Sequence, residues 1–113
     1  MQKLSDTALE YVANYFQALS EPTRLKLLNE LRQGEKSVGE LAQKLNFTPA
    51  NISRQLSMLA KQGLVARTSQ GNMAYYSIKD PSIFKLCDIV CDTVARQFAD
   101  QSQLHRELTG QIV

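Results

Sequence analysis

Two short helical patterns, joined by a turn of only a few residues, lie near the middle of the chain. Ser37 and Glu40 form a capping-box sequence, in which the serine side chain accepts from the backbone N–H of Glu40 and the glutamate reaches back. Asn46 suits the left-handed conformation that ends a helix. Thr48 and Pro49 then supply an N-cap and a first-turn proline for a second helix. Two helices this close together predict a helix-turn-helix motif.

Apolar residues at helical spacing predict two further helices ahead of this motif. The first runs from about Ser5 to Leu19, and the second begins at Pro22 and ends near Gly34. The fourth helix, which is the second of the motif, ends at Gly63. Its buried side carries Ile52, Leu56 and Leu59.

After the fourth helix the apolar period shortens to that of strands. Residues 64–67 and 74–78 predict two strands around a turn at 69–72. In that turn Gly71 and Asn72 tolerate the positive φ angles of a hairpin tip. The helix-turn-helix is therefore followed by a β-hairpin.

A long last helix completes the expected fold. Asp80 and Pro81 cap and begin it. Its apolar stripe comprises Ile83, Leu86, Cys87, Val90, Cys91, Val94 and Phe98. The order α-α-α-α-β-β-α is that of a mainly helical winged helix-turn-helix with a β-hairpin wing. A chain of 113 residues, 43% of them hydrophobic, is long enough for one core, so we expect residues 1–113 to form a single winged helix-turn-helix domain.

The sequence contains no run of about 18 apolar residues and no apolar stretch near its N-terminus. We therefore expect neither a membrane span nor a signal peptide. Its two cysteines do not form the framework of a secreted disulfide-rich protein. Together these features predict a cytoplasmic protein with no membrane partner.

Positive charge is concentrated in the middle of the chain. No acidic residue lies between Glu40 and Asp80, although the whole chain carries a net charge of only +2. The basic residues of this stretch are Lys44, Arg54, Lys61, Arg67 and Lys79. One part of the molecule is therefore suited to face a polyanion.

The fourth helix collects side chains that suit an element lying in a DNA major groove. Asn and Gln match the edge of adenine, Arg matches guanine, and Ser or Thr adapts to either base or to phosphate. The free N–H groups of a helix N-terminus also attract phosphate. The candidate DNA-binding residues are Thr48, Ala50, Asn51, Ser53, Arg54, Gln55 and Ser57. The alternative is an ordinary solvated face, which would carry Glu and Lys at four-residue spacing.

The hairpin is the second predicted contact with DNA, at the flanking backbone or the minor groove. Its candidate residues are Arg67 on the first strand and Ser69, Gln70 and Asn72 near the tip. The alternative is a hairpin that only covers the core. Tyr75 and Tyr76 alternate across the second strand, so we expect one to pack inward and the other to lie outward.

Three segments carry a family resemblance and together run from about Ala18 to Ile78. They are ALSEPTRLKLLNEL, SVGELAQKLNFTPANISRQLSMLAKQGLV and RTSQGNMAYYSI, and they resemble the ArsR/SmtB family of winged-helix repressors. The resemblance implies a homodimer packed through its first and last helices. It further implies binding to a palindromic operator as the apo-protein or reduced protein, and release when an inducer binds. One departure is visible, because the family often has His near Gln55, where this chain has Arg54-Gln55.

Recognition geometry also favours a dimer. One recognition helix covers too few base pairs for useful specificity, whereas two-fold pairing places two such helices about 34–36 Å apart on one face of B-DNA. Both terminal helices carry apolar stripes that such pairing would bury. We therefore expect a homodimer on double-stranded operator DNA.

Cys87 and Cys91 are the candidate sensor residues. At positions i and i+4 of a helix their side chains share a face, with Cβ atoms about 6 Å apart. Two thiolates so placed suit one soft ion, such as zinc, trivalent arsenic or antimony. A closed site needs further ligands, which could come from the same pair of a partner's last helix, from Asp88 or Asp92, or from His105.

Two other interpretations of the cysteines stay open. An oxidation switch would use a bridge between subunits or persulfide or sulfenic chemistry, because an intrahelical disulfide needs Cβ atoms about 3.8 Å apart. Alternatively, both cysteines only pack as small hydrophobes. The third helix, residues 40–45, has no cysteine where arsenic- and cadmium-sensing members resemble ELCVCDL, and the zinc-type histidine pattern of the last helix is absent. The inducer is therefore left open among metal, metalloid, oxidant and none.

An enzyme is not expected, because the sequence has no nucleophile–base pair, no Gly-rich phosphate loop and no paired carboxylates in an apolar setting. The main alternatives are a winged helix used for protein–protein contact and a regulator without cysteine-based sensing. The first would have an apolar or acidic fourth-helix face. A double-stranded RNA binder is disfavoured because an A-form major groove does not admit such a helix.

Overall fold

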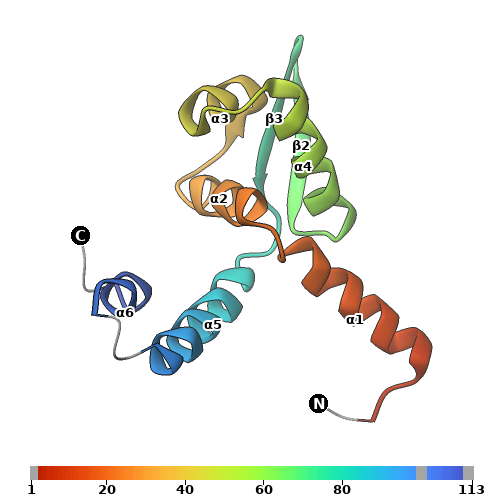
Figure 1. Cartoon of the computed structure of the whole chain (residues 1–113). Helices are drawn as coiled ribbons and strands as arrows, with labels where there is room; N and C mark the ends of the chain where they lie inside the picture. The colour runs from red at the N-terminus through yellow and green to blue at the C-terminus, as the bar shows by residue number, and fades with distance from the viewer. Residues whose placement is uncertain (1–2, 99–101, 111–113) are drawn as a thin grey trace. The chain divides into compact units, whose positions relative to one another are not determined.

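The computed structural model describes residues 3–98 and 102–110, and the chain folds as two compact units, residues 1–80 and 81–113 (Figure 1). The elements of the first unit are α1 (Asp6–Ala18), α2 (Pro22–Leu31), β1 (Lys36–Ser37), α3 (Val38–Leu45), α4 (Pro49–Lys61), β2 (Val65–Gln70) and β3 (Met73–Ile78). The second unit contains α5 (Ile83–Gln97) and α6 (Ser102–Leu108). The mainly helical fold with a small antiparallel wing is the one that the sequence predicts.

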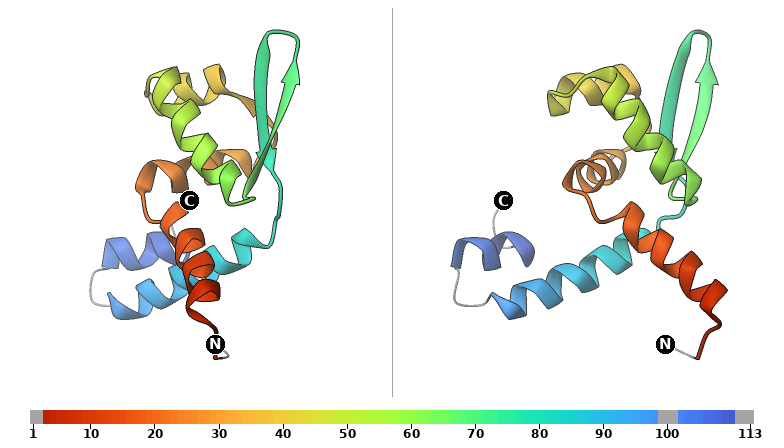
Figure 2. Two further views of the ribbon diagram at one scale, coloured as in Figure 1. Left: turned by 90° about the vertical axis from the view of Figure 1, so that its right-hand side faces the viewer. Right: turned by 45° about the vertical axis from the view of Figure 1, so that its right-hand side comes forward.

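The core of the first unit lies among α2, α3, α4 and the base of the hairpin. Helices α3 and α4 lie next to each other, and the β2–β3 hairpin extends alongside α4 (Figure 2). The largest fully buried side chains of this unit are Leu27, Leu28, Leu41, Ile52, Leu56, Leu59, Leu64 and Val65. Burying one such side chain stabilises a fold by about 1.5–3 kcal/mol relative to leaving it in water. This core therefore holds α3 and α4 firmly in place.

The predicted helix-turn-helix is confirmed in its local detail. At the start of α3, Ser37 Oγ accepts from the Glu40 backbone N–H at 3.1 Å, and Glu40 Oε1 accepts from the Ser37 N–H at 3.0 Å. Asn46 ends α3 with a left-handed φ of 59°. Thr48 caps α4 by accepting from the backbone N–H of Asn51 at 3.2 Å.

The hairpin is longer than predicted and belongs to a three-stranded antiparallel sheet. The strand order is β1-β3-β2, and β1 was not predicted because two residues are too few to show alternation. Ser69 and Gln70 are paired strand residues, so the turn consists of Gly71 and Asn72 alone. Gly71 has a φ of 63°, whereas Asn72 does not adopt the positive φ that it would tolerate. A two-residue loop with glycine first needs a positive φ only at that glycine.

The second unit differs from the predicted single last helix. Helix α5 begins at Ile83 and not at Pro81, because the backbone N–H of Phe84 donates to the Pro81 carbonyl at 3.1 Å in a tighter turn ahead of the helix. The prediction that Asp80 and Pro81 begin the helix is therefore wrong. A separate helix, α6, follows α5 and contacts it. In the described part of the chain, no helix combines the length and the apolar character needed to cross a lipid bilayer.

The capping box of α3 makes stability depend on pH. The backbone N–H and side chain of Ser37, with Lys36 nearby, hold the pKa of Glu40 below its ordinary value of 4.5. Because this pKa is lower in the folded than in the unfolded protein, the carboxylate stabilises the fold above about pH 4.5, and this contribution is lost as the pH falls through the folded pKa. We expect Glu40→Gln to lower the free energy of unfolding at pH 7 and to lose this deficit in acid.

Urea unfolding of the wild type and of the variant between pH 7 and pH 3 measures this difference. Glu10→Gln, an exposed change within α1, is the matched control. A deficit of Glu40→Gln that stays constant over the whole range would contradict the prediction.

Candidate nucleic-acid interface

Helix α4 buries one face completely and leaves the opposite face to solvent. Ile52, Leu56 and Leu59 have no exposed surface. Their spacing turns the predicted DNA-binding positions outward. Of these positions, Ala50, Ser53, Arg54 and Ser57 are exposed, and Asn51 and Gln55 are half-buried. The structure therefore brings the predicted polar side chains together on one face.

The start of α4 is suited to an anion. Thr48 is exposed at the N-cap, and no acidic residue lies in the first turn of the helix. The positive end of the helix dipole is therefore not neutralised by the chain itself. Backbone N–H groups at such a helix end attract phosphate oxygens.

The polar side chains of α4 are already hydrogen-bonded to one another. Arg54 Nη2 donates to Asn51 Oδ1 at 3.0 Å, and Gln55 Nε2 donates to the same oxygen at 3.4 Å. The hydroxyl of Ser57 donates to the Ser53 carbonyl at 3.0 Å, which leaves its oxygen as an acceptor. The face is thus partly preorganised and does not consist of independent side chains.

Arg24 on α2 contacts this face and is not among the residues that the sequence patterns predicted. Its side chain is only 7% exposed, and its Nη1 donates to Gln55 Oε1 at 2.8 Å. Its Nε and Nη2 donate to the carbonyls of Ala18 and Gln17 at the end of α1. A signal was present, because Arg24 lies one turn before Leu27 and Leu28 on the buried stripe of α2, where a charged residue is unusual.

The wing carries the second group of predicted residues. Arg67 Nη1 donates to Ser69 Oγ at 2.9 Å, and both side chains are exposed on one face of β2. Gln70 is instead held by Glu35, whose Oε1 accepts from its Nε2 at 3.2 Å. Asn72 is exposed in the turn. Gln70 is therefore the wing residue least ready for an outside ligand.

The structure also shows where the two tyrosines of β3 and the basic residues of the first unit lie. Tyr76 is buried and Tyr75 is half-buried, which confirms that the two side chains point to opposite faces of β3. Lys44 forms an ion pair with Glu30 at 3.0 Å, so its charge is partly compensated. Arg54, Arg67 and Lys61 are exposed. The positive charge of the stretch is therefore concentrated on α4 and the wing.

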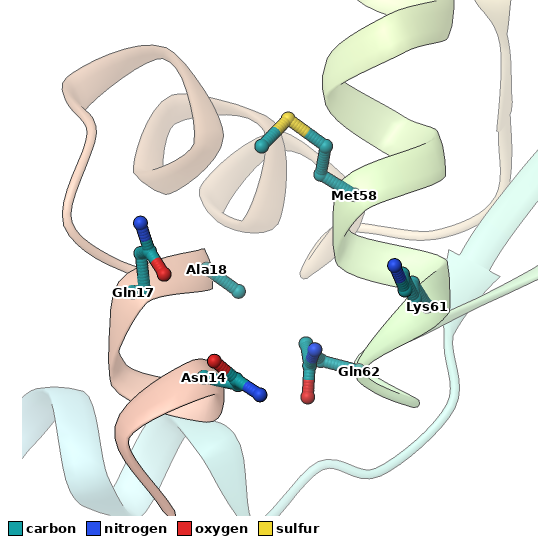
Figure 3. A pocket seen from close by; sticks show the side chains of 6 residues that line it. All are labelled: Asn14, Gln17, Ala18, Met58, Lys61 and Gln62. Carbon is teal, nitrogen blue, oxygen red and sulfur yellow. The ribbon is translucent and has the colours of Figure 1, made fainter. Parts of the chain in front are cut away.

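A cavity of about 300 Å³ lies between α1 and the end of α4. Asn14, Gln17 and Ala18 line it from α1, and Met58, Lys61 and Gln62 line it from α4 and its C-cap (Figure 3). Met58 also contacts Arg24, whose Nη1 lies 3.4 Å from its Sδ. The wall of this cavity is thus shared with the contacts of Arg24.

The predicted sensor residues lie in the second unit. Cys87 and Cys91 are both half-buried thiols on α5. Among the described side chains, no group of three or more His, Cys, Asp and Glu residues is arranged to hold a metal ion. Asp88 and Asp92 are exposed, and the side chain of His105 lies outside the described part. Within the described part of the chain, the candidate soft-ion ligands of this helix face are therefore the two thiols.

The amino-acid sequence is similar to those of bacterial regulatory proteins. Residues 21–67 match the family model described as bacterial regulatory protein, arsR family. The HTH-type transcriptional regulator Rv0081 of Mycobacterium tuberculosis is 31% identical over 105 residues, which are 92% of this chain and 92% of that protein. A "Probable mercury resistance operon repressor" of Streptomyces lividans is 35% identical, covering 66% of this chain and 59% of that protein.

Solved structures of related regulators resemble the fold of this chain. The crystal structure of M. tuberculosis Rv0081 matches with a TM-score of 0.76 at 32% identity, and the match covers 87% of this chain and 99% of that chain. The solution structure of the homodimeric winged helix-turn-helix DNA-binding domain Mb0332 from Mycobacterium bovis matches with a TM-score of 0.71 at 31% identity. That match covers 87% of this chain and 93% of the other.

Proposed function

The chain belongs to the ArsR family of bacterial regulatory proteins, and we propose that it is a dimeric transcriptional regulator that binds operator DNA. The observation that carries this proposal is the division of α4 into a fully buried apolar face and an outward polar face. That face carries side chains that can read base edges, beside a wing with an exposed arginine. We expect the two units of residues 1–113 to function together as one DNA-binding domain. We also expect the protein to act in the cytoplasm, where bacterial operators lie.

The two predicted contacts have different roles. The outward face of α4 would enter the major groove, where Arg54 and Asn51 reach base edges and the start of the helix meets a phosphate. Arg67 and Ser69, on one face of β2, would contact the flanking backbone or minor groove together with Asn72. Gln70 is placed less well, because Glu35 already accepts its amide N–H.

Dimerisation is supported by exposed apolar side chains on α1 and on α5, the helix that corresponds to the predicted last helix. On α1, Tyr11 is 73% exposed and Phe16 is 48% exposed. On α5, Ile89 is 64% exposed and Val90 is 48% exposed. Exposed apolar surface of this kind marks association sites, and a two-fold dimer would present two α4 helices to a palindromic operator. The relative Mb0332 is described as homodimeric.

We further propose that the protein is a repressor and that Cys87 and Cys91 sense a thiol-reactive signal. The pair is half-buried on one face of α5, so a soft metal, a metalloid or an oxidant can reach it. The S. lividans relative is named as a repressor of a mercury resistance operon, and mercury is a thiophilic metal. Arsenic, antimony or zinc bound by these thiols would need ligands from a second copy to complete a closed site.

Arg54→Ala should weaken binding to operator DNA by about 1–3 kcal/mol, because it removes a cation from the α4 face. For the same reason, the slope of the logarithm of the binding constant against the logarithm of the salt concentration should become shallower by up to about 1. Fluorescence anisotropy with the DNA upstream of the protein's own reading frame, at about 50–200 mM salt, measures both effects. Arg106→Ala on α6 is the control of equal charge change. Wild-type binding that is insensitive to salt would contradict the proposed phosphate contacts.

Ile89→Asp should raise the dimer dissociation constant at least about tenfold, because the dimer interface would then bury an unpaired carboxylate from each subunit. Sedimentation velocity at micromolar protein measures the shift from dimer to monomer. Met73→Asp replaces a wing residue that is 49% exposed and serves as the control. A wild-type protein that stays monomeric at all concentrations rules out this assembly.

Replacing Cys87 and Cys91 together by serine should leave DNA affinity within about twofold and abolish release by the inducer, because serine does not replace a thiolate toward soft ions or oxidants. Release is titrated in parallel with zinc, arsenite, antimonite and a persulfide donor. If the double variant still releases DNA as the wild type does, the two cysteines only pack and the regulator senses without them.

A further inference from the structure

Arg24 is a buried cation whose side chain, among the described residues, forms no hydrogen bond with a carboxylate. Its Nε donates to the Ala18 carbonyl at 2.7 Å and its Nη2 to the Gln17 carbonyl at 3.1 Å, both at the C-terminal end of α1. The negative end of the α1 dipole therefore compensates the charge. Its remaining printed contacts are to Gln55 and Met58 of α4. Gln17, Ala18 and Met58 can be followed in Figure 3.

The guanidinium determines the orientation of the Gln55 amide. A guanidinium has donors only, so the amide atom that meets Arg24 Nη1 at 2.8 Å must be the acceptor Oε1. The donor Nε2 of Gln55 then points toward Asn51 and lies 3.4 Å from its Oδ1. The orientation of one amide is thus imposed by a residue on a different helix.

The orientation of the Asn51 amide is fixed in the same way, by two donors. Arg54 Nη2 donates to Asn51 Oδ1 at 3.0 Å, and Gln55 Nε2 donates to it as well. An amide oxygen has two lone pairs, so these two donors use its accepting capacity. Asn51 therefore offers its Nδ2 donors outward and keeps no acceptor for an outside partner.

This polarity decides which base edge Asn51 can read. Specific recognition of adenine needs an amide that donates to N7 and accepts from N6, whereas guanine offers only acceptors, N7 and O6, beside each other in the major groove. Arg54 presents donors as well. Asn51 and Arg54 together therefore present donors alone, which match guanine and do not match adenine.

We propose that Arg24 is a positioning residue for DNA specificity: through Gln55 it orients the Asn51 amide so that the base facing Asn51 is read as guanine. This inference rests on the proposed DNA-binding function and adds to it a residue that does not touch DNA. The relay consists of Arg24, Gln55, Asn51 and Arg54.

The test changes the polarity of the relay and keeps its packing. Gln55→Glu keeps an acceptor for Arg24, and the new carboxylate pairs with the buried cation. It removes one of the two donors to Asn51 Oδ1, so the Asn51 amide turns, donates Nδ2 to the carboxylate and gives up its bond with Arg54, which exposes Oδ1. Arg24→Ala is unsuitable alone, because it leaves buried acceptors unpaired and can unfold the protein.

The measurement is in vitro selection of binding sites from a random duplex library, followed by affinity measurements on the selected sites. Asn51→Ala identifies the base pair that Asn51 reads, as the position at which preference is lost. Wild type should select guanine there, and Gln55→Glu should select adenine or cytosine, whose exocyclic amines are donors. The ratio of affinities for guanine over adenine at this position should fall about tenfold. Gln43→Glu, the same amide-to-carboxylate change at an exposed position of α3, should keep guanine.

The possible results separate the inference from the function on which it rests. A library from which wild type enriches no sequence contradicts DNA recognition itself. A wild type that selects any base other than guanine at the Asn51 position overturns the relay, and so does a folded Gln55→Glu that keeps guanine or an Asn51→Ala that changes no preference. Thermal unfolding of each variant confirms that the selected protein is folded.

Discussion

Helix α4 has to be held by the core along one side and exposed along the other, and the arrangement of the first unit follows from this requirement. Ile52, Leu56 and Leu59 lose all contact with water, and a helix anchored at three such points cannot rotate without exposing them. The polar face therefore projects in one fixed direction. The caps at Thr48 and Ser37 set where α4 and α3 begin, so the two helices meet at a defined turn.

Arg24 adds a polar link to this apolar anchoring. It joins the end of α1 to the middle of α4 through carbonyl oxygens on one side and Gln55 on the other. A buried cation of this kind is costly without hydrogen-bond partners, and each of the three guanidinium nitrogens of Arg24 donates to an oxygen. The cavity beside Met58 shares this region, so packing against α1 and the orientation of the α4 side chains are physically connected.

The predicted sensor site is less complete in a single chain than the predicted DNA-binding face. The helical spacing of Cys87 and Cys91 follows from the sequence, and the structure places both thiols half-buried on α5. Two thiols are fewer ligands than a closed metal site needs. In the function proposed above, a second copy of the chain would supply the rest, and signal detection would then depend on dimerisation through the same helix.

Local sequence signals were sufficient for the capping box, the left-handed Asn46 and the outward face of α4, because each depends on residues within a few positions of one another. The strand β1, the extent of the hairpin, and the start of α5 depended on pairing or turn geometry that such short segments do not show. Only the tertiary structure revealed that Arg24 contacts Gln55, 31 positions away, and that Asn51 already accepts two hydrogen bonds. Hydrogen-bond polarity belongs to a network of donors and acceptors, and residues from different helices form that network only when the chain has folded.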